Sequence, residues 1–62
     1  MQVGDVVKTR DGYWPVVVCV VTDKIDNSNG EGSARLYCFQ HEQYFWEAVP
    51  ERRFEVILKK LA

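Results

Sequence analysis

Short apolar runs separated by polar turns fill the chain, and none has the period of an amphipathic helix. The clearest run is residues 16–21, Val-Val-Val-Cys-Val-Val. Its β-branched side chains favour an extended strand, because a helix restricts their χ1 rotamers. An uninterrupted apolar run is typical of a strand that is covered on both faces. We therefore predict a strand here, preceded by a short strand at residues 5–9 and a turn at Asp11-Gly12.

Two later segments alternate in the manner of strands with two different faces. Residues 34–40, ARLYCFQ, place Ala34, Leu36 and Cys38 on one face. Residues 43–49, QYFWEAV, place Tyr44, Trp46 and Ala48 on one face and Phe45, Glu47 and Val49 on the other. The polar stretch 23–33 contains Asn29-Gly30, which predicts a hairpin turn, and residues 40–42 predict a tight turn. Pro50 predicts a single helical turn, followed by a last strand that ends near Leu58.

Together these elements predict an all-β fold, a small five-stranded antiparallel barrel with a single helical turn before the last strand. Nothing repeats and no linker divides the chain, so we expect a single domain over residues 1–62. A bent sheet that closes on itself encloses a small core and removes exposed strand edges. The core must be small, because a chain of this size buries only about 60% of its unfolded surface.

Composition and charge narrow the classes of function. Hydrophobic residues are 47% and charged residues 27%, which is typical of a globular protein. Eight Lys and Arg against nine Asp and Glu give a net charge of -1, so binding to nucleic acid is not expected. We interpret Arg52, Arg53, Lys59 and Lys60 as a solvated rim. The apolar runs are far shorter than the roughly 20 residues that cross a bilayer. The first residues are polar, and we expect neither a membrane span nor secretion by a signal peptide.

The cysteines and the histidine do not form a recognisable chemical site. A hairpin centred between residues 28 and 29 places Cys19 opposite Cys38. A disulfide is geometrically open to them, but without an export signal we expect two reduced, buried thiols. Cys38, His41 and Glu42 are too few for zinc, which takes four ligands. "NGEGS" lacks the lysine and the helix of a phosphate loop, and His41 has no evident nucleophile partner. We predict no enzyme activity, no metal and no cofactor.

The eight aromatic residues have two expected roles. We expect Trp46, Phe54, Tyr37 and Phe45 to fill the core, because aromatic side chains bury large areas in a chain with few aliphatic residues. Tyr13 and Trp14 differ because they stand at a turn, so at least one of them should reach the surface. An exposed Tyr or Trp is a preferred anchor of protein interfaces.

Several segments, in order, resemble the barrel of PWWP domains, which belong to the Tudor-like group. They are Gly4-Asp5-Val6-Val7, Gly12-Tyr13-Trp14-Pro15 with the valines after it, Leu36-Tyr37-Cys38-Phe39, and residues 45–52. The resemblance covers about residues 3–58 and implies a Src-homology-type five-stranded barrel. It also implies a cage for methylated lysine made by Tyr13, Trp14 and Phe39. Gln40 stands where that family has a glycine.

A second resemblance is to small proteins of unknown role encoded by tailed bacteriophages. Residues 1–7 and the closing Phe54-Glu55-Val56-Ile57 fit that group, as does the whole length from the initiator methionine to a short charged end. The resemblance implies a complete small protein that serves as a structural or accessory part of the virion, or as a host-directed binding protein. It places the protein in the virion or in the host cytoplasm.

We therefore predict a non-catalytic protein-binding module, with a viral structural protein or a host protein as partner. The predicted contact residues are Tyr13, Trp14, Phe39, Gln40 and His41, together with the loop 24–33 and the turn 40–43. A free edge strand would add main-chain hydrogen bonds. An oligomer or a place in a larger assembly is compatible with this prediction. The alternative is a PWWP-like or Tudor-like module that recognises methyl-lysine or nucleic acid.

Overall fold

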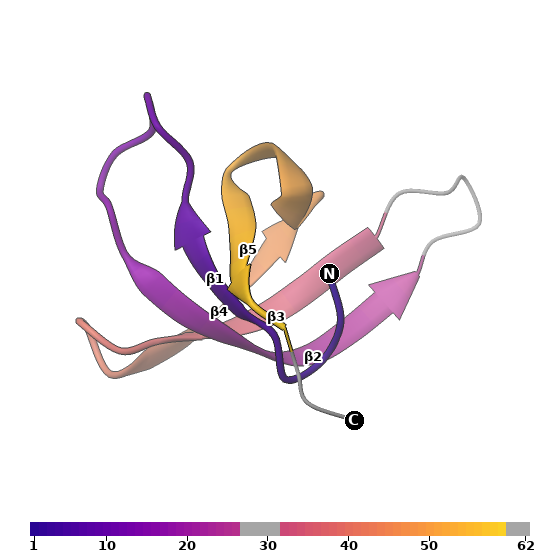
Figure 1. Ribbon diagram of the computed structural model, residues 1–62. Coiled ribbons are helices and arrows are strands. Elements are labelled where there is room, and N and C mark those ends of the chain that lie inside the picture. Colours follow the sequence, from indigo (N-terminus) through magenta and orange to yellow (C-terminus); the bar gives the residue numbers. More distant parts are fainter. Residues whose placement is uncertain (27–31, 60–62) are drawn as a thin grey trace.

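Five antiparallel strands form the protein in a computed structural model that describes residues 1–26 and 32–59 (Figure 1). The strands are β1 (Val6–Thr9), β2 (Val18–Asp26), β3 (Gly32–Cys38), β4 (Gln43–Ala48) and β5 (Phe54–Leu58), and a 3₁₀ turn, η1 (Pro50–Arg52), precedes the last of them. The predicted all-β class, the five strands and the single helical turn are confirmed. The predicted Asn29-Gly30 turn lies outside the described residues. No helix in the described ranges has the length and apolar character needed to span a membrane.

Strand β2 begins two residues later and ends five residues later than the predicted strand at residues 16–21, so both predicted boundaries were wrong. Lys24 and Ile25, predicted in a loop, pair with Ala34 and Ser33 of β3. The register shifts between Val21 and Asp23, so β2 contains one extra residue there, as in a β-bulge. Ladder hydrogen bonds do not require apolar side chains, so the strand continues into polar sequence.

The strands are ordered β4-β3-β2-β1-β5. Figure 1 shows a strongly curved sheet, yet β4 pairs only with β3, and β5 only with β1, within the described residues. Strand pairing therefore does not close the sheet into the predicted barrel. After β4 the chain passes through Val49, which has a left-handed φ of 49°, and then through η1. These two features direct β5 toward β1 instead of back along β4.

The core lies on the inner face of this sheet. It consists of Val7, Val17, Cys19, Val21, Ala34, Leu36, Cys38 and Phe54. The predicted alternation of β3 is confirmed, because Ala34, Leu36 and Cys38 are all buried. Phe54 is a core residue as predicted, and Phe45 is partly buried against this cluster. Val18 and Val20 are only partly buried, so complete cover on both faces of the apolar run was a wrong prediction.

Two predicted core residues lie on the outer face instead: Trp46 is 52% exposed, and Tyr37 is partly buried outside the core cluster. The inner face of β4 instead carries Phe45 and Glu47, which are both half-buried. Two contacts explain this choice of face. The ring of Phe45 lies 6.2 Å from that of Phe54, and Arg53 Nη1 lies 3.4 Å from Glu47 Oε2. Arg53 thus neutralises the carboxylate that alternation places inside, and Trp46 faces outward.

Candidate binding surface

The loop between β1 and β2 presents Tyr13 and Trp14 to solvent. Gly12 has a φ of 91°, which favours glycine, and the Tyr13 amide donates to the Arg10 carbonyl at 3.2 Å. The peptide between Trp14 and Pro15 is cis. Trp14 is 85% exposed and Tyr13 is 45% exposed. The prediction that at least one of the pair reaches the surface is confirmed.

Thr9 holds the base of this loop, a role that the sequence analysis missed. Its buried hydroxyl accepts a hydrogen bond from the Val17 amide at 3.0 Å. The same oxygen lies within donating distance of the carbonyl oxygens of Pro15, at 3.2 Å, and Val17, at 3.3 Å. The only signal in the sequence is a threonine at the end of a strand, which does not by itself predict such bonds.

The turn between β3 and β4 contains the other three predicted contact residues. The Gln40 side chain faces its own fold, because its Oε1 accepts a hydrogen bond from the Val18 amide at 3.0 Å. Gln40 therefore ties this turn to the start of β2. Phe39 is 50% exposed, and its ring packs edge-on against Tyr37 at 5.6 Å. His41 is exposed at the tip of the turn.

The three residues of the suggested methyl-lysine cage do not contact one another through their rings. Within residues 1–26 and 32–59, the ring contact of Phe39 is with Tyr37, and none joins it to Tyr13 or Trp14. The protein's own Arg35 lies beside another ring, with its guanidinium carbon 4.9 Å from the centroid of the Tyr44 ring. The structure therefore brings Phe39 to a different aromatic group from the one the resemblance implies.

That group is the outer aromatic face, which we define as Tyr37, Phe39, Tyr44 and Trp46 on β3, β4 and their connecting turn. Tyr37 and Tyr44 are direct cross-strand partners, with ring centroids 5.0 Å apart. Tyr44 is 60% exposed, Trp46 52% and Phe39 50%. These are large apolar surfaces in contact with water. Strand alternation could have identified this face, had Glu47 rather than Trp46 been placed inside.

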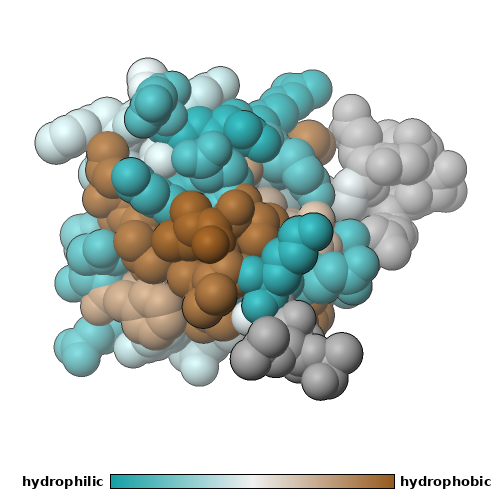
Figure 2. Space-filling view, viewed as in Figure 1, coloured by the Kyte–Doolittle hydropathy of each residue, from teal (hydrophilic) through white to brown (hydrophobic). Residues whose placement is uncertain are grey.

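The outer aromatic face continues into an apolar row that crosses the whole sheet. Pairing runs from Leu58 to Val6, then to Val20, Tyr37 and Tyr44. Figure 2 shows apolar side chains gathered near the middle of the view, over the region where β1 and β5 lie nearest the viewer in Figure 1, with hydrophilic side chains around them. Exposed apolar patches of this kind mark interaction surfaces.

The charges beside the outer aromatic face neutralise each other. Arg35 stands opposite Trp46 and forms an ion pair with Asp23, with 2.6 Å between Nη2 and Oδ2. The Arg35 Nε also donates to the hydroxyl of Thr22 at 3.2 Å. Arg35 is thus held beside the Tyr44 ring by the ion pair with Asp23 and the hydrogen bond to Thr22, and the ion pair neutralises its charge.

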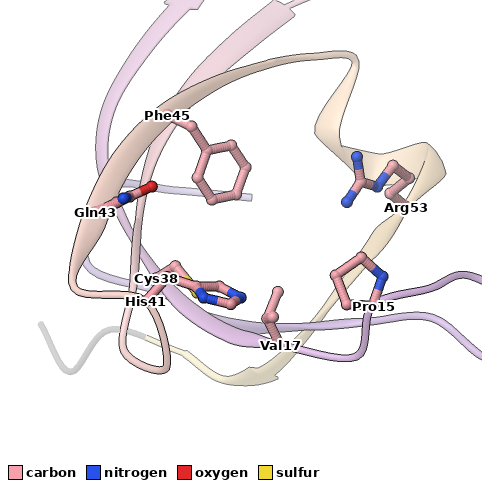
Figure 3. Close-up of a pocket in the computed structure, with 7 residues that line it drawn as sticks. All are labelled: Pro15, Val17, Cys38, His41, Gln43, Phe45 and Arg53. Carbon is pink, nitrogen blue, oxygen red and sulfur yellow. The ribbon is translucent and has the colours of Figure 1, made fainter.

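A hollow opens on the other side of the sheet, at the seam between β4 and the segment before β5. It has a volume of about 220 Å³ and is lined by Pro15, Val17, Cys38, His41, Gln43, Phe45 and Arg53. In Figure 3, Phe45 and Pro15 face it from opposite sides. Small-molecule sites usually have roughly 300 to 1,000 Å³, so this hollow is small for such a ligand.

Two cysteines lie near the hollow, and one of them has a shifted pKa. Burial, and after it the neighbouring Cys38, raise the pKa of the Cys19 thiol to about 12, so Cys19 stays protonated at neutral pH. Both cysteines are buried and free. Among the described residues there is no group of three or more His, Cys, Asp and Glu that could hold a metal ion.

Comparison with known proteins does not assign the chain to a family. No protein-family model matches it, and neither a curated protein nor a solved structure does.

Proposed function

We propose that the protein is a non-catalytic module that binds another protein through its outer aromatic face. The observation that carries the proposal is the exposure of Tyr44, Trp46 and Phe39, each at least half exposed, on regular strands and a tight turn. Tyr and Trp are enriched among the residues that dominate binding energy. Their few rotatable bonds keep the entropy cost of binding low. The β3–β4 hydrogen bonds lower this cost further, because they already fix the backbone of these residues.

The charges of this face indicate the chemistry of the partner. Arg35 is paired with Asp23, so the face is apolar and aromatic with a neutralised centre. Such a surface favours a partner that presents apolar side chains and hydrogen-bond acceptors. Phosphate backbones are poor partners, because the chain has a net charge of -1 and releases few counterions.

The β1–β2 loop is a second proposed contact. Trp14 is the most exposed of the large hydrophobic residues that the structure describes, and Thr9 fixes the base of the loop. His41 remains a proposed contact at the tip of the β3–β4 turn. Gln40 supports that turn through its bond to Val18, so we assign it a positioning role.

Two further proposals, the fold family and the biological role, come from the resemblances found in the sequence. We infer a Src-homology-type, Tudor-like barrel, in which side chains rather than main-chain hydrogen bonds bridge the seam. The Phe45–Phe54 and Arg53–Glu47 contacts support this inference. The bacteriophage resemblance supports one of two roles. The protein is a structural or accessory part of the virion, or it binds a host protein. Mass spectrometry of purified particles tests the virion role, which fails if the protein is made during infection but never found in particles.

The binding proposal is tested by retention of a partner on the immobilised protein. Wild type, Trp46→Ser and Trp14→Ser are exposed to lysate of cells that express the gene, and retained proteins are quantified by mass spectrometry. The two variants are matched, since each removes one exposed indole. We expect a specific protein on wild type that Trp46→Ser loses. Equal retention by wild type and Trp46→Ser, with the loss confined to Trp14→Ser, would move the site to the loop.

A further inference from the structure

Strand β4 is an edge strand whose outward main-chain groups can be assigned. The Val49 amide donates to the Gly32 carbonyl at 2.8 Å, which extends the β3–β4 ladder by one pair. Alternate residues of an antiparallel strand bond to the same neighbour. Phe45 and Glu47 therefore direct their main-chain groups toward β3, whereas Tyr44 and Trp46 direct theirs away from it, toward the edge where no strand pairs with β4 among the described residues.

This edge has few of the features that usually prevent pairing with another chain, and the charge of its one inward-facing carboxylate, Glu47, is neutralised by Arg53. Residues 43–48 contain no Lys, Arg or Pro, which are common protective residues on edge strands. Their only charge is Glu47, which faces inward and lies 3.4 Å from Arg53. The opposite edge differs, because β5 carries the exposed Glu55 and is followed by Lys59. Of the two edge strands, β4 thus has no exposed charged side chain, whereas β5 has one.

We propose that a second copy of this chain pairs antiparallel with β4, about a two-fold axis at Phe45. In this register Tyr44 of each copy faces Trp46 of the other, so the residues with outward main-chain groups form the hydrogen-bonded pairs. A two-fold axis perpendicular to the sheet keeps outer side chains on the outer face. The two outer aromatic faces then become one continuous surface, joined by two Tyr–Trp cross-strand pairs. The inference goes beyond the proposed function and does not depend on it.

Charge complementarity selects this register. With Phe45 at the axis, Gln43 of each copy faces Glu47 of the other, which places an amide donor opposite a carboxylate. A shift of two residues in one direction puts Glu47 opposite the apolar Phe45, and a further such shift puts it opposite a second Glu47. A shift in the other direction pairs fewer residues of β4. An isologous interface of this kind closes on itself and does not propagate into a fibre.

Sedimentation equilibrium of the full chain over a wide range of concentration tests the proposal. We expect a monomer–dimer equilibrium that Gln43→Glu weakens, because two carboxylate pairs then oppose each other, and that Gln43→Lys strengthens. Each such change should alter the dimer dissociation constant by roughly 2- to 30-fold, since cross-strand charge pairs have modest energies. The matched control is Gln2→Glu, the same substitution at an exposed residue outside β4, which should leave the constant unchanged.

Amide hydrogen exchange gives a second readout that does not depend on variants. The amides of Tyr44 and Trp46 should become protected as the protein concentration rises. A chain that stays monomeric at all concentrations overturns the proposal. So does a dimer that responds equally to Gln43→Glu and Gln43→Lys, or one that leaves the Tyr44 and Trp46 amides unprotected, because the partner would then occupy another surface.

Discussion

Cys19 of β2 and Cys38 of β3 lie directly opposite each other on the inner face of the sheet, and both are free and at most 2% exposed. This pair lies at the end of the β2–β3 ladder that is farthest from the connection between the two strands, and it fixes the register there. It also places two thiols in an apolar core, where ionisation of Cys19 would create a buried charge.

The pKa of Cys19 predicts an alkaline loss of stability. Burial first, and then the proximity of Cys38, raise this pKa from 9.0 to about 12. Below pH 9 the protonated Cys19 thiol makes its full contribution to the free energy of unfolding. Above pH 9 the unfolded chain loses a proton that the folded chain keeps. The free energy of unfolding should fall by about 1 kcal/mol per pH unit until the folded thiol titrates. Urea denaturation at several alkaline pH values measures this slope. Cys19→Ala should reduce it, and an unchanged slope would contradict the assignment.

The sequence predicted this part of the fold well, for a physical reason. The β-branched run and the alternation of Ala34, Leu36 and Cys38 both follow from local backbone geometry. The predicted pairing of Cys19 with Cys38 is confirmed, but nearer the turn Ile25 pairs with Ser33, one residue out of the predicted register. The bulge between Val21 and Asp23 accounts for this difference, and no side chain of that segment predicts an extra residue.

Phe54 and Trp46 should differ strongly in their effect on stability, although the sequence placed both in the core. Phe54 is fully buried, so Phe54→Ala should cost about 3 to 5 kcal/mol and can unfold so small a domain. Trp46 is 52% exposed, so Trp46→Ser should change the free energy of unfolding much less. Urea denaturation of the two variants checks this. Equal losses would mean that Trp46 is packed inside.

Trp46 shows where sequence reasoning fails. Alternation states that Trp46 and Glu47 lie on opposite faces, but hydrophobicity alone chooses the wrong face. The outcome depends on Arg53, a residue of another segment that neutralises Glu47, and on the stacking of Phe45 near Phe54. Such long-range partners are not visible in a local pattern. The same limit explains why the bonds of Thr9 and Gln40 to the β1–β2 connection were missed.

The hydroxyl of Thr9 should contribute measurably to the free energy of unfolding. Thr9→Val keeps the volume but removes the acceptor for the buried Val17 amide, and should cost about 1 to 3 kcal/mol. Thr9→Ser keeps the hydroxyl and serves as the control, with a smaller loss from the missing methyl group. Thermal unfolding followed by circular dichroism compares the two. A Thr9→Val variant as stable as wild type would show that the loop is held by other contacts.

A methyl-lysine ligand should not bind to the β1–β2 loop. Trp14 is 85% exposed and has no ring contact with Phe39 in the structure's described ranges, so no aromatic box encloses a cation there. Titration with a trimethyl-lysine peptide should leave the tryptophan fluorescence of wild type and of Trp14→Ala unchanged. A saturable change in wild type that Trp14→Ala abolishes would instead establish the recognition module.

The central claim is that the outer aromatic face binds the partner, and nuclear magnetic resonance of the complex tests it most directly. Titration of the isotope-labelled protein with the protein that wild type retains should shift the ring signals of Tyr37, Phe39, Tyr44 and Trp46. The signals of Val17 and Arg53, which line the hollow on the other side, should stay in place. Shifts confined to the hollow or to Trp14, with the outer rings unaffected, would contradict the account.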